Sequence, residues 1–299
     1  MINESGILNI NTKNLIYNYN FFKKLKKNLI VAPTIKANAY GLGDKRIYNL
    51  LLNQGCKHFF VATLSEGLRL NNKNKLIKIY VLNGLQNYKL HKFTNANLIP
   101  VVNTIDEYKI KYNIKQKKLF STFANQKNKS VIFSLANAHG SIINKTYLYD
   151  MIRPGIGIYG CYENKQLEKK IKNVINFKGK IIQIKDLQKN QYIGYNRTFK
   201  TKTKTMVAII GLGYEDGIPR LLSNKGFVYF KKDRFKIIGR ISMDSFTIDI
   251  SKCSHDLKVG MYVDIINDEH KVDKFAKKCK TISYEVLTSI GNRVYRNYE

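Results

Sequence analysis

Short β-rich runs alternate with helical segments in the first half of the chain, and no other feature constrains the fold as strongly. The runs at residues 58–64, 78–83 and 98–102 are separated by segments in which apolar residues recur at helical spacing. Further β-rich runs follow at residues 118–123, 130–135 and 155–159. Alternating strands and helices form parallel β/α units, and functional residues gather beyond the carboxyl ends of such strands. The sequence therefore predicts an α/β fold with its site at the strand ends.

From about residue 173 the pattern changes to longer strand-like runs joined by tight turns. The segments 227–230 and 235–238 flank Lys-Lys-Asp-Arg, which indicates a hairpin, and apolar residues alternate with polar ones from Phe246 to Ile250. We therefore predict two domains. Residues 12–172 would contain the β/α units, and residues 173–299, joined by residues 1–11, would form a mainly β domain.

The composition is that of a folded protein without a membrane anchor. The chain has 299 residues, of which 44% are hydrophobic, and a chain of this length buries a substantial core. No apolar run approaches the roughly 20 residues that span a bilayer, and the N-terminus lacks the charged and apolar regions of a signal peptide. We expect a cytoplasmic protein.

The formal net charge is +31, and the lysines that produce it are spread from Lys13 to Lys280. Such diffuse charge argues against a specific nucleic-acid site, because those sites gather basic residues on one face. Weak adherence to polyanions at low salt is still expected. The cysteines are far apart and form no Cys-x-x-Cys pair, so we predict reduced thiols and no metal site. They are Cys56, Cys161, Cys253 and Cys279.

Lys36 stands where a predicted strand opens into a loop. It belongs to the stretch Thr-Ile-Lys-Ala-Asn-Ala-Tyr-Gly-Leu-Gly, residues 34–43, and a helical pattern follows. Most lysines are solvated surface charges, and this chain has many. A lysine held among apolar and small residues loses its proton more readily, however, which makes Lys36 a candidate Schiff-base former or general base.

Several motifs, in the same order, resemble those of the alanine racemases. Residues 35–43 resemble the lysine motif that binds pyridoxal phosphate in this family. The other motifs extend the resemblance over nearly the whole chain: Val61-Ala62 with Glu66, Ser134 to Asn137, Arg153 to Gly160, Gly194-Tyr195, Gly213 to Gly217, Gly239 to Asp244, and Ser283 to Glu285 followed by Arg293 and Arg296. So many ordered motifs are not expected by chance.

The resemblance implies a pyridoxal 5'-phosphate enzyme with two catalytic residues, Lys36 and Tyr195. Lys36 would hold the cofactor as an internal aldimine and act as one acid/base group, and Tyr195 matches the other. Two groups are needed because inversion at the substrate Cα removes a proton on one face and returns it on the opposite face. Without this resemblance Tyr195 would be interpreted as a packing residue, because the chain has 20 tyrosines.

The remaining cofactor contacts of the family match five further positions. Arg153 matches the arginine that faces the pyridine nitrogen, where a guanidinium that stays protonated disfavours protonation of the ring. Tyr40 and Tyr284 match residues that bind the phosphate. The backbone N–H groups of Gly155 and Ile156 match the family's other phosphate donors, and backbone donors of this kind suit an anion.

The resemblance also implies the substrate contacts, the fold and the assembly. Tyr214 and the backbone N–H of Met243 match groups around the substrate, and the Met243 N–H is expected to meet its carboxylate. The fold would be an N-terminal (β/α) barrel followed by a mainly β C-terminal domain. In this family the lysine of one subunit faces the tyrosine of the other, which implies a homodimer with shared active sites.

The chain departs from the family in two places. The segment between Val102 and Leu135 is shorter and lacks the Asp-Thr-Gly-Met-x-Arg-Leu-Gly motif. The barrel is therefore expected to lack one strand and two helices, and the arginine that assists the substrate carboxylate has no local replacement. Ala138 stands where the family usually has a phosphate-binding serine. His139 follows it, but a lone histidine is more often a packing or surface residue.

The leading hypothesis is therefore racemisation of L-alanine and D-alanine, which supplies D-alanine for peptidoglycan. The missing segment leaves two alternatives open. One is a degenerate homologue that binds the cofactor without turning over alanine, and the other is a racemase of relaxed amino-acid specificity.

Overall fold

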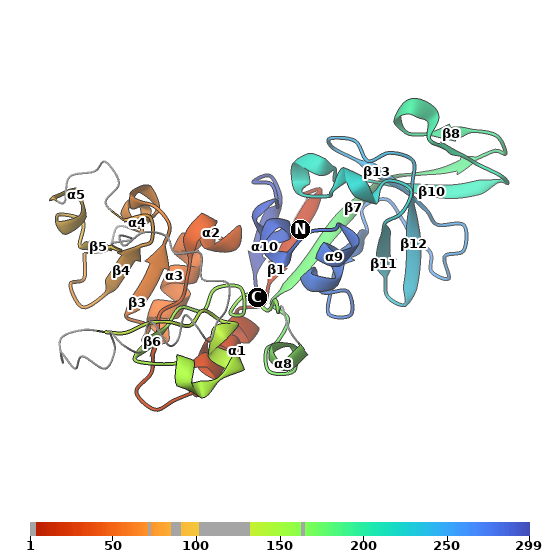
Figure 1. Ribbon diagram of the computed structural model, residues 1–299. Helices are drawn as coiled ribbons and strands as arrows, with labels where there is room; N and C mark the ends of the chain where they lie inside the picture. Colours follow the sequence, from red (N-terminus) through yellow and green to blue (C-terminus); the bar gives the residue numbers. More distant parts are fainter. Residues whose placement is uncertain (1–3, 71–72, 85–90, 102–131, 163–164) are drawn as a thin grey trace. The chain divides into compact units, whose positions relative to one another are not determined.

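The computed structural model describes residues 4–70, 73–84, 91–101, 132–162 and 165–299. The chain divides into two compact units, Thr12–Lys172 and Met1–Asn11 with Asn173–Glu299 (Figure 1). They are called the β/α unit and the β unit below, and each is described by itself. The strand predicted at residues 118–123 and most of the shortened segment before Leu135 lie outside the described residues.

The β/α unit alternates short strands with helices, which confirms the predicted fold class. Its apolar strand residues, such as Val31, Phe59 and Ile79, are fully or almost fully buried. Its described elements are α1 (Thr12–Lys23), β2 (Ile30–Val31), α2 (Lys36–Tyr40), α3 (Asp44–Asn53), β3 (His58–Val61), α4 (Leu64–Arg69), β4 (Lys78–Val81), α5 (His91–Thr94), β5 (Leu98–Pro100), α7 (Gly140–Ile143), η1 (Lys145–Tyr147), β6 (Met151–Ile152) and α8 (Lys165–Glu168).

The strands of this unit are parallel, so their carboxyl ends meet at one edge. β4 lies between β3 and β5, and β2 pairs with β6. A bridge between Thr34 and Phe60 joins the chain after β2 to β3, and a bridge between Asn137 and Arg153 extends the set beyond β6. The segments that follow β2 and β6 are therefore neighbours, and they carry Lys36 and Arg153.

Two of the predicted β-rich runs in this unit are not strands: residues 155–159 and, as far as the run at residues 130–135 is described, residues 132–135. Residues 155–159 form turns instead of a strand, because Ile158 N–H donates to the Gly155 carbonyl and Tyr159 N–H to the Ile156 carbonyl. The isoleucines that made this run look like a strand are buried within the turn. Helix α4 is capped by Thr63, in a capping box with Glu66.

The β unit contains one large sheet, and long β7 runs through it (Figure 1). The predicted hairpin is formed by β11 and β12. The described elements are β1 (Gly6–Ile10), β7 (Ile175–Leu187), β8 (Tyr192–Ile193), η2 (Tyr195–Arg197), β9 (Phe199–Lys200), β10 (Thr205–Ile210), η3 (Tyr214–Asp216), η4 (Arg220–Leu222), β11 (Phe227–Phe230), β12 (Asp233–Ile238), β13 (Phe246–Asp249), β14 (Tyr262–Ile266), α9 (Val272–Lys278), α10 (Ser283–Thr288) and β15 (Tyr295–Tyr298).

A second pairing of β7 closes this sheet on itself. The first half of β7 pairs with β14 and β1, and its second half pairs with β10. The strands β7, β10, β13, β12, β11 and β14 therefore form a ring around a core that includes Phe177, Ile181 and Ile248. The loops at the rim of this ring are held by a rigid scaffold, which suits a site that must keep its geometry. In the described part of the chain, no helix is long and apolar enough to cross a membrane.

Candidate active site

Lys36 is the first residue of α2, which is a left-handed turn. Ala37, Asn38, Ala39 and Tyr40 have φ angles of 52°, 54°, 52° and 56°. Each non-glycine residue in this conformation costs about 1–2 kcal/mol, so other contacts must hold the turn. Hydrogen bonds from Gly41 N–H to the Ala37 carbonyl and from Gly43 N–H to the Asn38 carbonyl, both 2.9 Å, do part of this. The half-buried Lys36 side chain makes no hydrogen bond or ion pair within the described ranges.

Tyr40 lies against the turn that follows β6. A Cβ placed on Gly155 would be 2.3 Å from the Tyr40 hydroxyl oxygen, so only glycine leaves room for this approach. The Tyr40 and Tyr159 ring centroids are 4.9 Å apart, and the Tyr159 hydroxyl donates to the Thr34 carbonyl at 2.9 Å. Burial raises the pKa of Tyr40 to about 12. Its hydroxyl therefore stays protonated, as a donor, across the physiological range.

Arg153 is anchored by the chain beside β6. Its guanidinium donates to the Ser134 carbonyl at 2.9 Å and to the Ser134 hydroxyl at 2.5 Å, and it lies 5.9 Å from the Phe60 ring centroid. Burial lowers the pKa of Arg153, but a guanidinium starts so high that it remains charged at neutral pH. The side chain is thus a fixed cation at the carboxyl edge of the strands.

Two consecutive backbone N–H groups have no acceptor in the part of the chain that the structure describes. Gly155 and Ile156 are buried, yet neither N–H group donates a hydrogen bond to any residue that the structure describes. Buried N–H groups without partners are rare, because each costs the free energy of desolvation. Together with the Tyr40 hydroxyl they form a small cradle of donors, and such a cradle fits an anion such as a phosphate group.

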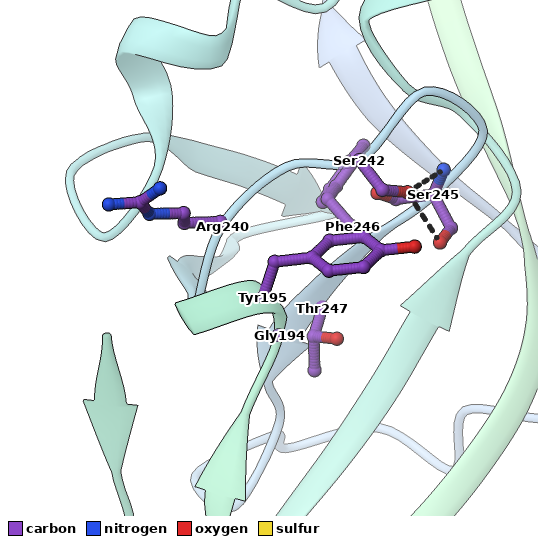
Figure 2. Close-up of a pocket in the computed structure, with 7 residues that line it drawn as sticks. All are labelled: Gly194, Tyr195, Arg240, Ser242, Ser245, Phe246 and Thr247. Atoms are coloured by element: carbon purple, nitrogen blue, oxygen red, sulfur yellow. Dashed lines mark hydrogen bonds between the residues drawn. The ribbon is translucent and has the colours of Figure 1, made fainter. Parts of the chain in front are cut away.

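In the β unit, Tyr195, Tyr214 and Met243 line one pocket. Arg220, Arg240 and Asp244 also line it. Tyr195 follows Gly194, whose φ of 71° turns the chain toward the pocket. Figure 2 shows its ring extending over Phe246 with the hydroxyl on the side of Ser242 and Ser245, while Arg240 extends the opposite way. The Tyr195 hydroxyl has no polar partner among the described residues.

The loop that carries Met243 packs directly on the loop that carries Tyr214. A Cβ on Gly213 would be 2.0 Å from the Met243 carbonyl oxygen. Tyr214 N–H donates to the Ser242 carbonyl at 3.0 Å, and Glu215 N–H to the Met243 carbonyl at 3.2 Å. The Met243 N–H itself has no acceptor in the described part of the chain, which leaves it available to a ligand.

The other predicted positions are less closely tied to these groups. Tyr284 lies on α10 and is not one of the residues that line the Tyr195 pocket. Ala138 is buried, and a Cβ on Gly157 would lie 3.2 Å from its Cβ, so residue 138 lies beside the turn that carries the backbone donors. His139 is half-buried at the start of α7. The segment in which the family has its carboxylate-assisting arginine is shorter in this chain, and most of it lies outside the described residues.

A cluster of possible metal ligands is accounted for by its own hydrogen bonds. Asp233, Cys253 and His255 bring ligand atoms within 4.8 Å of one another. The Asp233 Oδ2 atom already accepts from Ser254 N–H at 2.9 Å, from the Ser254 hydroxyl at 2.8 Å and from the His255 ring at 3.0 Å. The carboxylate joins β12 to the loop at residues 253–255, and its pKa is lowered by these donors.

Sequence reasoning missed the residues that brace the two groups. Glu66 accepts a hydrogen bond from the N–H that follows Lys36. Arg293 bridges Asp216 at 2.6 Å and Asp244 at 2.7 Å, which ties together the loops that carry Tyr214 and Met243. Both residues lie within the quoted motifs, but their partners are distant in sequence, and only the folded chain identifies them.

Comparisons with known proteins cover both units. The family "Alanine racemase, N-terminal domain" matches residues 10–118, and the family "Alanine racemase, C-terminal domain" matches residues 174–298. The alanine racemase of Brucella suis is 30% identical over 369 residues, which cover 98% of this chain and 93% of the relative. That of Rickettsia canadensis is 30% identical over 355 residues, with 97% and 98% covered. Both alignments exceed the 299 residues of this chain, so each relative has residues where this chain has none.

Solved structures give the same result. The chain resembles the crystal structure of alanine racemase from Bartonella henselae with covalently bound pyridoxal phosphate, with a TM-score of 0.84, 25% identity and 99% of each chain covered. It also resembles the biosynthetic alanine racemase from Pseudomonas aeruginosa, with a TM-score of 0.86, 20% identity and 99% of each chain covered. Each similarity spans nearly the whole of both chains, and together they show the shared fold.

Proposed function

The chain belongs to the alanine racemase family and is a racemase, and we propose that it interconverts L-alanine and D-alanine with pyridoxal phosphate bound at Lys36. The observation that carries the cofactor proposal is the cradle of donors beside Lys36. Two buried backbone N–H groups and the Tyr40 hydroxyl suit the phosphate, and the Bartonella relative holds this cofactor covalently.

Each residue at the strand ends would have its own part in holding the cofactor. Lys36 would bind it covalently through its amino group, Gly155, Ile156 and Tyr40 would hold the phosphate, and Arg153 would face the pyridine nitrogen. When bound, the cofactor supplies a conjugated ring that accepts electron density from the substrate Cα–H bond. The anchored guanidinium of Arg153 limits that effect, because it disfavours protonation of the ring and so suppresses side reactions.

The proton chemistry requires a second group opposite Lys36. Tyr195 supplies it, since its hydroxyl is unpartnered within the described residues and borders a pocket. Removal of the Cα proton by one group and return by the other inverts the substrate. The Met243 N–H meets the substrate carboxylate, and Tyr214 lies beside it.

We further propose a homodimer in which Tyr195 of one subunit faces Lys36 of the other. The support is the exposure of the Tyr195 pocket, where Tyr195 is 70%, Met243 50% and Tyr214 45% accessible. Exposed apolar groups gathered around a pocket mark interaction surfaces. The product would supply D-alanine for peptidoglycan.

A racemisation assay with purified protein and added cofactor tests the function. We expect interconversion of the alanine enantiomers together with the absorbance band of a lysine-bound cofactor. A band without turnover of any amino acid would instead indicate the degenerate homologue, which the comparisons do not favour. Comparable rates on serine and alanine would indicate relaxed specificity, for which the missing carboxylate-assisting arginine is the motivation.

A further inference from the structure

We propose that Glu66 is a positioning residue for Lys36, which fixes the peptide group after the lysine and so orients the lysine side chain. The inference rests on the proposed cofactor role of Lys36 and adds to it a residue from a different β/α segment. Glu66 does not itself contact the reacting atoms; it acts through Ala37.

The Glu66 carboxylate joins two strand ends. One oxygen, Oε1, accepts from Ala37 N–H at 2.8 Å. The other, Oε2, accepts from Ala62 N–H at 2.7 Å and Thr63 N–H at 3.3 Å. Because Ala62 and Thr63 follow β3 and Ala37 follows Lys36, a single charged group sets the distance between the loop after β2 and the loop after β3.

Capping of α4 explains only half of this arrangement. Glu66 N–H donates to the Thr63 hydroxyl at 3.3 Å, and the Glu66 Oε2 accepts from the Thr63 N–H, as in any capping box. The contact of Oε1 with Ala37 is not part of that motif. It reaches a residue 29 positions earlier, at the first left-handed residue of the turn.

The turn needs such a contact at this point. Later residues of the turn are held by local bonds, such as the one from Gly41 N–H to the Ala37 carbonyl. The Ala37 N–H donates instead to Glu66, so this bond holds the peptide plane between Lys36 and Ala37. The direction of the lysine side chain depends on that plane.

Two variants separate positioning from capping. Glutamine is accepted in a capping box, but Glu66→Gln has one acceptor oxygen in place of two. That oxygen is expected to keep the two donors at Ala62 and Thr63 and to turn the side-chain NH₂ toward Ala37. Thr63→Ala is the matched control, because it removes the other half of the same cap and leaves the Ala37 contact intact.

The experiment compares the full-length wild type with both variants by two readouts. The first is amide hydrogen exchange in the peptide of residues 36–43 before cofactor is added. The second is the rate at which added pyridoxal phosphate becomes covalently attached to Lys36, followed by absorbance and by borohydride trapping with mass spectrometry. We expect Glu66→Gln to raise the exchange and lower the attachment rate by roughly tenfold or more, as for loss of a hydrogen bond to a charged group. Thr63→Ala is expected to change both less than roughly twofold while lowering Tm.

Two results would overturn the inference, and they differ. If Glu66→Gln and Thr63→Ala change exchange and attachment equally, Glu66 serves only as a cap and the cofactor role of Lys36 stands. If trapping of the wild type labels no lysine, or a lysine other than Lys36, the proposed function fails and the positioning role with it.

Discussion

The residues of the cofactor side, around Lys36, and those of the tyrosine side, around Tyr195, differ in their exposure and in how firmly hydrogen bonds hold them. In the β/α unit, Tyr40 is only 5% accessible, Arg153 is anchored by Ser134, and the turn after Lys36 is fixed by hydrogen bonds. In the β unit, Tyr195 is 70% accessible and its hydroxyl has no partner among the described residues. The first group is mostly buried and held by contacts within its own unit, whereas the second is exposed.

This difference follows from the role that we propose for each group. A covalently held cofactor with a doubly charged phosphate needs buried donors in a fixed arrangement, because donors that are already in place need not be ordered when the ligand binds. A tyrosine that delivers a proton to substrate must face the space where substrate enters. An exposed tyrosine pocket in one chain also leaves a surface for a second copy to cover, as the proposed homodimer requires.

The largest expected effect comes from removing the lysine. Lys36→Ala should abolish the cofactor absorbance band and reduce racemisation by more than about a thousandfold, since both the covalent bond and one acid/base group are lost. Lys45→Ala, an exposed lysine on α3, is the control and should leave both unchanged. Retention of the band in Lys36→Ala would show that another lysine holds the cofactor.

Removing the Tyr195 hydroxyl should lower turnover without affecting cofactor binding. Tyr195→Phe should keep the absorbance band but lower kcat by roughly 10² to 10⁴, the usual range for loss of one acid/base group. Tyr192→Phe, at an exposed position of the adjacent strand, is the matched control. If the band disappears along with the activity, Tyr195 supports the cofactor and is not solely an opposing acid/base group.

Mixing the two inactive variants tests whether the Lys36 and the Tyr195 of one site come from different subunits. A heterodimer of Lys36→Ala and Tyr195→Phe has one site with both changes and one site with neither, if each site takes its lysine and tyrosine from different chains. After random reassortment, about a quarter of the wild-type activity should return. Sites contained within single chains would give no recovery, and that result would refute the shared-site arrangement.

The sequence predicted what depends on local pattern and ordered motifs. The strands β3, β4 and β5, the β11–β12 hairpin and the burial of Phe246, Ile248 and Ile250 follow from alternation of apolar residues. The roles assigned to the site residues stay predictions, although the structure brings Tyr40 against Gly155 and gathers Tyr195, Tyr214 and Met243 around one pocket.

What was missed depends on contacts that no local window contains. Nothing in Ala-Asn-Ala-Tyr favours a left-handed turn strongly, apart from Asn38 and the glycines that follow. The turn persists because Glu66, far along the chain, accepts the Ala37 N–H. The same limit explains the wrong strand at residues 155–159, where buried isoleucines pack in a glycine-rich turn.

A smaller effect should appear at alkaline pH. Burial raises the pKa of Tyr40 to about 12, whereas a tyrosine in the unfolded chain ionises near pH 10. Between these values the unfolded state loses its proton first, so this group's contribution to stability falls as pH rises, by up to about 1.4 kcal/mol per pH unit. Tyr40→Phe should therefore show a shallower loss of unfolding free energy from pH 10 to 11 in urea titrations. Tyr17→Phe, whose ring is exposed in the same unit, should follow the wild type, and equal slopes for all three would contradict the assignment.

The smallest effect should come from restoring a hydroxyl to the cofactor side. Ala138 is buried beside the turn that carries the Gly155 and Ile156 donors, so Ala138→Ser adds a hydroxyl near the proposed phosphate position. We expect cofactor affinity to rise by roughly threefold to tenfold, the value of one hydrogen bond. The unfolding free energy of the cofactor-free protein should fall by about 1 kcal/mol, because the hydroxyl then lacks that partner. Ala136→Ser places the same group at another buried position, and it should lower the unfolding free energy without raising cofactor affinity. If Ala138→Ser leaves affinity unchanged and His139→Ala lowers it, the histidine holds the phosphate in place of a group at position 138.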